Sequence, residues 1–137
     1  MIRVVDLFSG AGGLTLGFKN KVLNDTFVKS DDYNILFANE IDKNASDAFS
    51  LNFPQIPMLN CSITQITQNY LVENNIEYSD VDLVIGGPPC QSFSTVGRRQ
   101  YDERAQMYKE YRRMLSFLQP KVFLFEKESI FFFIKSR

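Results

Sequence analysis

The sequence predicts an α/β protein built on a mostly parallel sheet. Short apolar runs bounded by glycine, asparagine and proline alternate with longer amphipathic segments, which is the pattern of successive β-α-β units. The 137 residues suffice for one domain or part of one, and 45% of them are apolar, enough for a packed core. We find no internal repeat and no linker between domains.

The elements expected from this alternation follow from the apolar spacing and the breakers between them. In chain order they are a strand over 3–8, a helix over 13–20, a surface loop over 21–34, a strand over 35–39, a helix over 43–52, a short strand over 58–60, a weaker helix over 64–75, a strand over 81–85, a loop to about 103, a helix over 105–118 and a strand over 122–125. After this fifth strand we expect no further strand, which leaves an open sheet edge.

The helix over 105–118 has the clearest amphipathic pattern. Its apolar side chains fall at helical spacing, while Lys109, Arg112 and Arg113 are predicted to face solvent. Pro120 ends it. The apolar residues are Met107, Tyr108, Tyr111, Met114, Leu115 and Leu118.

Composition excludes several classes of protein. The chain has no histidine, so serine-histidine and cysteine-histidine mechanisms are excluded, and two cysteines with scattered carboxylates make a zinc site improbable. The net charge of −1 argues against a free-standing DNA-binding module. Because no apolar run approaches the roughly 20 residues of a membrane span and no signal peptide is visible, we expect a cytoplasmic protein with no membrane contact.

Two segments at the ends of the first two strands indicate a nucleotide-like ligand. Residues 8–13, Phe-Ser-Gly-Ala-Gly-Gly, allow a tight turn and a close backbone approach at a helix amino terminus. In residues 39–42, Asn-Glu-Ile-Asp, an acidic side chain can accept hydrogen bonds from ribose hydroxyls. The alternatives are a turn without ligand and simple capping of the next helix by Glu40 or Asp42. The glycine spacing does not fit the dinucleotide pattern, which lowers the likelihood of a redox enzyme.

A third segment supplies a candidate nucleophile. Cys90 follows Gly86-Gly87-Pro88-Pro89 in the loop after the strand over 81–85. A lone cysteine is usually an inert buried residue. Here two prolines stiffen its approach and polar residues surround it, which favours a reactive thiol.

Taken in order, these three segments resemble the DNA (cytosine-5) methyltransferase family over residues 3–126. The resemblance implies a Rossmann-like S-adenosylmethionine-dependent methyltransferase fold, truncated after about strand five. It implies methyl transfer from S-adenosylmethionine to carbon 5 of cytosine in double-stranded DNA, with the base flipped out of the helix, in a restriction-modification system. No metal is implied.

The resemblance also assigns site residues. Cys90 would add to carbon 6 of cytosine, and Glu126 would bind the cytosine ring. DNA contacts would come from Gln91, Ser94 and Arg104. The cofactor contacts would come from Phe8, Ser9, Gly10, Ala11, Gly12, Gly13, Leu14, Glu40, Ile41, Ser62, Ile63 and Pro88.

The chain departs from the family pattern at two places. Lys127-Glu128 replaces the family's Asn-Val after Glu126, and Ser62 stands where the family usually has an aspartate that binds the adenine amino group. We therefore expect an incomplete cofactor-binding catalytic domain over 1–126 and an unrelated apolar tail over 127–137. The target-recognition domain is absent from this sequence, so the isolated chain is expected to be inactive. The alternatives are a half of a split methyltransferase that acts through a complementing chain, and, less favoured, a nucleotide-dependent oxidoreductase.

Overall fold

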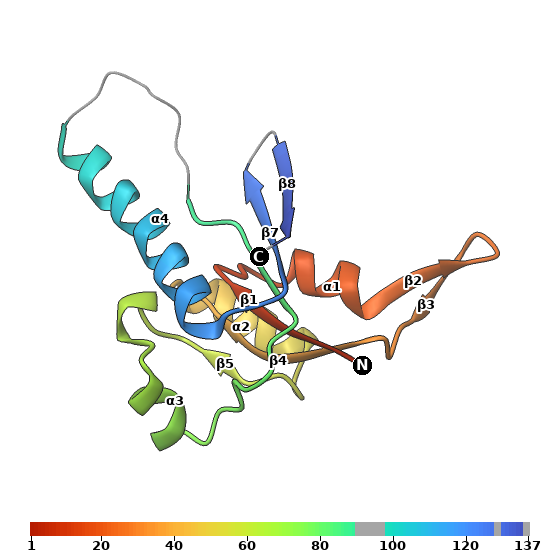
Figure 1. Cartoon of the computed structure of the whole chain (residues 1–137). Coiled ribbons are helices and arrows are strands. Elements are labelled where there is room, and N and C mark those ends of the chain that lie inside the picture. The colour runs from red at the N-terminus through yellow and green to blue at the C-terminus, as the bar shows by residue number, and fades with distance from the viewer. Residues whose placement is uncertain (90–97, 128–129, 136–137) are drawn as a thin grey trace.

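The computed structural model describes residues 1–89, 98–127 and 130–135, with the backbone alone for 98–105, 127 and 130–135. Its main feature is a six-stranded sheet in the order β5-β4-β1-β6-β7-β8 (Figure 1). The first five of these strands are parallel, and β8 runs antiparallel to β7. The strands of this sheet are β1 (Ile2–Leu7), β4 (Tyr33–Asn39), β5 (Met58–Leu59), β6 (Leu83–Gly86), β7 (Val122–Lys127) and β8 (Ile130–Lys135). This confirms the predicted mostly parallel α/β class.

Helices cover both faces of the sheet. They are α1 (Gly13–Lys19), α2 (Lys43–Asn52), η1 (Ile63–Gln65, a 3₁₀ turn), α3 (Gln68–Glu73) and α4 (Arg98–Leu118). The two faces have separate apolar cores, because the side chains of β1 alternate between them. Val5 and Leu7 pack with α3 and α4, whereas Val4 packs with Phe49 of α2 and the apolar side of α1. The central strands are thus buried on both faces, as their continuous apolar sequences require.

The structure corrects the expected loop over 21–34. It contains an antiparallel hairpin of β2 (Asn20–Leu23) and β3 (Thr26–Lys29), which projects from the body of the molecule (Figure 1). Asn24 and Asp25 both have positive φ, as a two-residue hairpin turn requires. Each of these strands has only four residues, with few apolar side chains among polar ones, so composition alone does not distinguish them from a loop.

Three other expectations were wrong. The weak helix over 64–75 divides into η1 and α3, because Ser62 and Thr67 each cap a separate turn. Helix α4 begins at Arg98 rather than at 105, so its first residues lie in the segment that was predicted to be a loop. The sheet also continues past β7, because residues 130–135 pair with β7 as β8.

No helix in the described ranges is both long and apolar enough to cross a membrane.

Candidate functional site

The carboxyl ends of four adjacent strands bring the predicted segments to one edge of the sheet. In register, Leu7 of β1 lies beside Asn39 of β4 and Gly86 of β6, and Gly86 lies beside Phe125 of β7. The glycine loop therefore follows β1, the acidic segment follows β4, Pro88 follows β6 and Glu126 lies at the end of β7. This edge is where ligands of open α/β sheets bind.

The glycine loop has the backbone conformation that its sequence predicts. Gly10 and Gly12 have φ of 54° and 98°, and Gly12 is the amino-terminal cap of α1. A Cβ on Gly12 would lie 2.5 Å from a ring carbon of Phe53, so packing as well as φ requires glycine there. Gly10 and Gly13 have open space where a Cβ would be, which leaves their backbone accessible to a ligand.

Glu40 joins the acidic segment to this loop. Its Oε2 accepts a hydrogen bond of 2.9 Å from Gly10 N–H, and its Oε1 accepts one of 2.8 Å from Asp42 N–H. Asp42 is the residue that caps α2, accepting from Ala45 N–H. The ambiguity left by the sequence is thus resolved: Asp42 caps the helix, whereas Glu40 orders the loop and keeps lone pairs for further donors.

The three other residues predicted to contact the cofactor near Glu40 differ in exposure and in contacts. They are Ile41, Ser62 and Ile63. Ile41 is 67% exposed, an unusual position for a large apolar side chain. Ser62 caps η1, and its hydroxyl lies 2.8 Å from the hydroxyl of Thr64. Ile63 is buried in the core below, so its side chain serves packing. Two asparagines connect the end of β4 to residues 59–61. Asn39 donates to the carbonyls of Leu59 and Cys61. Asn60 donates to the carbonyls of Glu40 and Ile41.

Glu126 lies against Gly87, three residues before Cys90. A Cβ on Gly87 would lie 2.5 Å from Glu126 Oε2, so the absence of a side chain makes room for this carboxyl. Pro88 is buried, while Pro89 is exposed. Cys90, Gln91 and Ser94 lie outside the described residues, and for Arg104 only its place in α4 is described.

Asp6 is a site residue that the sequence analysis missed. It is fully buried beneath the glycine loop, where Oδ2 accepts a hydrogen bond of 2.6 Å from the Thr15 hydroxyl of α1. Oδ1 is buried without a hydrogen-bond partner among the described residues. Burial raises the pKa of Asp6 to about 7, with a smaller contribution from the charge of Glu40, although the Thr15 hydrogen bonds act in the opposite direction. An acidic residue between the apolar residues of the buried second half of β1 was the available signal.

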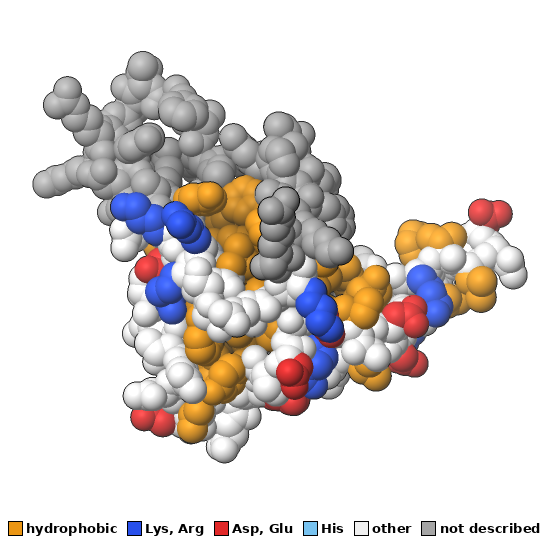
Figure 2. Space-filling view, in the orientation of Figure 1, with side chains coloured by type: hydrophobic (Ala, Val, Ile, Leu, Met, Phe, Trp, Pro, Cys, Tyr) orange, Lys and Arg blue, Asp and Glu red, His pale blue; other side chains and the backbone are white. Residues whose placement is uncertain are grey.

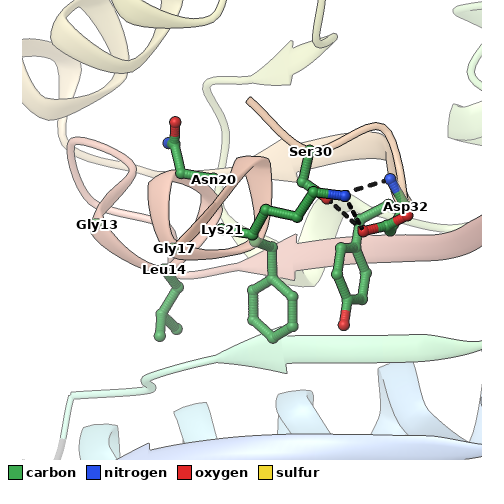
Figure 3. A pocket seen from close by; sticks show the side chains of 9 residues that line it. Gly13, Leu14, Gly17, Asn20, Lys21, Ser30 and Asp32 are labelled. Atoms are coloured by element: carbon green, nitrogen blue, oxygen red, sulfur yellow. Dashed lines mark hydrogen bonds and ion pairs between the residues drawn. The ribbon is translucent and has the colours of Figure 1, made fainter. Parts of the chain in front are cut away.

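A separate hollow lies between α1 and the base of the hairpin. It has a volume of about 390 Å³ and includes Gly13 and Leu14, but none of Gly10, Glu40 or Ser62 (Figure 3). Lys21 and Ser30 both bond to Asp32 Oδ2 at its rim, at 3.2 and 2.7 Å. Within the described residues no group of histidine, cysteine and acidic side chains could hold a metal ion.

Comparison with known proteins agrees with this geometry. The family model of C-5 cytosine-specific DNA methylases matches residues 2–127. The type II methyltransferase M1.HphI of Haemophilus parahaemolyticus is 36% identical over 91% of this chain and 32% of its own length. M.DdeI of Desulfomicrobium norvegicum is 37% identical over 91% of this chain and 27% of its own length. The chain thus spans about a third of the length of these relatives.

Solved structures show the same fold. A putative DNA modification methyltransferase encoded within an E. coli prophage superposes with a TM-score of 0.71 at 32% identity, covering 91% of this chain and 31% of that one. A Spodoptera frugiperda DNMT2 variant superposes with a TM-score of 0.62 at 26% identity, covering 91% and 35%. The fold is that of S-adenosylmethionine-dependent methyltransferases, as predicted.

Proposed function

The chain belongs to the C-5 cytosine-specific DNA methylase family, and we propose that residues 1–126 are the cofactor-binding and nucleophile-bearing part of its catalytic domain. The proposed reaction transfers a methyl group from S-adenosylmethionine to carbon 5 of a flipped cytosine in double-stranded DNA. The observation that carries this proposal is the convergence of the glycine loop, Glu40, Pro88 and Glu126 at one edge of the sheet.

The described residues fit S-adenosylmethionine. The Gly10 and Gly13 backbone is open, and the Glu40 carboxylate, already oriented by two N–H groups, can accept from ribose hydroxyls. The exposed Ile41 offers an apolar surface for the adenine, with Ser62 beside it. The loop residues Phe8, Ser9, Ala11, Gly12 and Leu14, together with Ile63 and Pro88, complete the proposed cofactor-binding set. The cofactor would supply an electrophilic methyl group at this edge.

Cys90 and Glu126 have the proposed catalytic roles. The Cys90 thiolate forms a bond to carbon 6 of cytosine, which makes carbon 5 nucleophilic enough to take the methyl group. Loss of the carbon-5 proton and of the thiolate then restores the aromatic ring. Glu126, which lies against Gly87, would hydrogen-bond to the cytosine ring and so favour the addition. Gln91, Ser94 and Arg104 are the proposed DNA contacts.

A trapping experiment tests the role of Cys90. In DNA whose target base is 5-fluorocytosine, the adduct cannot lose fluorine as a cation, so the covalent complex persists. A protein that joins this chain to the family's remaining segments is expected to form that complex, whereas Cys90→Ser forms none and keeps its cofactor affinity. Trapping by the serine variant would remove Cys90 from the mechanism.

A second proposal is that the chain acts as one part of a split methyltransferase, with the target-recognition domain on a complementing polypeptide. We further propose that 127–137 is a tail unrelated to the family, which fits a family match that ends at 127. Methyl transfer that appears only on mixing with a second polypeptide would favour the split arrangement.

A further inference from the structure

Arg113 of α4 connects two parts of the molecule that are far apart in the sequence. Its Nη2 donates to the carbonyl of Ile63 at 2.7 Å and its Nη1 donates to that of Ile66 at 3.0 Å. Its Nε donates to Glu110 Oε2 at 2.6 Å. This arginine was expected to be solvated, but its guanidinium bonds to both ends of the turn that follows Ser62.

The arrangement depends on features that only arginine has. The planar guanidinium presents donors in several fixed directions, so one side chain can bond to two carbonyls and a carboxylate together. Glu110, whose side chain is 14% exposed, orients the guanidinium from one helical turn away. A lysine would keep the charge but could not reproduce this fork.

The turn held in this way carries Ser62 and Ile63 of the proposed adenine site. On its other side, Asn39 and Asn60 tie the same segment to the Glu40 strand end. The segment 59–66 is therefore fixed from both sides: by β4 at its beginning and by α4 at its end. Only the second attachment depends on a charged side chain reaching about 50 residues back along the chain.

We propose that Arg113 is a positioning residue for the adenine end of the cofactor site. It fixes the position of the 62–66 turn relative to Glu40, so that Glu40 can bind the ribose while Ser62 contacts the adenine. This inference rests on the proposed cofactor function. It predicts that loss of Arg113 weakens the adenine contacts while leaving the glycine loop intact.

The test uses ¹⁵N amide shifts of the full chain titrated with S-adenosylhomocysteine to millimolar concentration. In the wild type, the amides of Gly10, Gly13, Glu40 and residues 62–66 are expected to respond. In Arg113→Met, the response at Gly10 and Gly13 remains, that of 62–66 is lost, and affinity falls about tenfold. Arg113→Lys recovers part of the loss. Arg112→Met is the matched control, because Arg112 is exposed on the same helix, and it behaves as wild type.

Each outcome decides between named alternatives. An unchanged pattern in Arg113→Met, or simultaneous loss of both responses in a folded protein, would overturn the positioning role. A wild type that responds at Gly10 and Glu40 but not at 62–66 would overturn it while keeping the cofactor site. No response anywhere would overturn the proposed function itself. If Arg113→Met does not fold, Glu110→Ala, which removes the acceptor for Arg113 Nε, is expected to give the same selective loss at 62–66, and a wild-type pattern in that variant would overturn the proposal.

Discussion

Asp6 is a buried carboxyl that also connects β1 to α1. Its carboxyl lies in the buried second half of β1, where a charge is costly, yet it also anchors α1 through Thr15. With a pKa of about 7, the group is half ionised at neutral pH and largely neutral only at lower pH. The unpartnered Oδ1 can then carry a proton, which is less costly to bury than a negative charge.

This raised pKa makes stability depend on pH in a specific direction. Because the pKa rises from 3.8 in the unfolded chain to about 7 in the folded one, the folded state holds the proton more tightly. The contribution is greatest below pH 3.8 and is lost as pH rises through 7, with a slope approaching about 1.4 kcal/mol per unit between these values. Asp6→Asn, which cannot ionise, should therefore gain stability relative to wild type between pH 5 and pH 8. Urea unfolding of both proteins at pH 5 and pH 8 measures the difference between their free energies of unfolding. If this difference is the same at both pH values, the raised pKa of Asp6 is contradicted.

Gly87 offers a second test at the residue scale. In Gly87→Ala the new Cβ would meet the Glu126 carboxyl, which lies at the free end of a flexible side chain and can move away. We expect the free energy of unfolding to change little, while methyl transfer in the reconstituted enzyme falls at least about tenfold, as for the loss of one charged hydrogen bond. Gly17→Ala is the matched control, since its Cβ meets nothing within 4 Å in α1, and it should keep full activity. Equal activity of the two variants would separate Glu126 from the chemistry.

The residue scale also shows where sequence reasoning succeeds. Glu40 and Asp42 could be singled out from their place after a strand, because strand ends meet at one edge whatever the details. Their division of roles could not be predicted, since either carboxylate can cap a helix and only the fold brings Gly10 to Glu40. Arg113 was missed for the same reason, because its partners are carbonyls, which are present in every sequence.

At the scale of elements, the β2–β3 hairpin contributes little to the core. Val22, Leu23 and Phe27 are 62%, 57% and 80% exposed, and Figure 2 shows their hydrophobic surface on the projecting arm. This explains why the sequence suggested a loop: a strand pair without a buried face has no strong apolar alternation. The central strands of the main sheet, β1, β4 and β6, are buried on both faces and were predicted well for the opposite reason.

Shortening the hairpin should therefore be tolerated. Replacing 22–27 with Asn-Gly keeps the Lys21 and Val28 pair and supplies a type I′ turn. We expect a change of less than about 0.5 kcal/mol in the free energy of unfolding, together with higher solubility, because exposed apolar side chains are removed. Phe49→Ala, in the core, provides the comparison and should cost about 3–5 kcal/mol. A loss of similar size in the shortened protein would show that the hairpin packs on the body.

At the scale of the whole molecule, the distribution of charge limits what the chain can do by itself. The net charge is −1, and Figure 2 shows several Lys and Arg side chains over α4. Base readout requires side chains placed in a groove, whereas phosphate contacts alone are nonspecific.

We expect the isolated chain to bind DNA weakly and without sequence preference. The binding constant should fall steeply with salt concentration, because counterion release is its main source of free energy. Binding isotherms over a salt series and bisulfite sequencing of mixed-sequence DNA measure the two properties. Methylation confined to one short motif, produced by this chain alone, would show that recognition lies within the 137 residues.

The central position of β1 has a consequence for how the protein folds during synthesis. β1 is made before the strands that pair with it, but Arg3 bonds to Asp82, 79 residues later, and Val4 pairs with Leu83. Such long separations slow folding, because the intervening chain must lose its freedom before the contact forms. The β1–β4 pair can form once β4 has left the ribosome, but the hydrogen-bonding edge of β1 that faces β6 stays unpaired until β6 has emerged as well. During translation the incomplete sheet, with its unpaired strand edge, is therefore exposed for seconds. A pause in synthesis after β4 should increase aggregation more than a pause after β6.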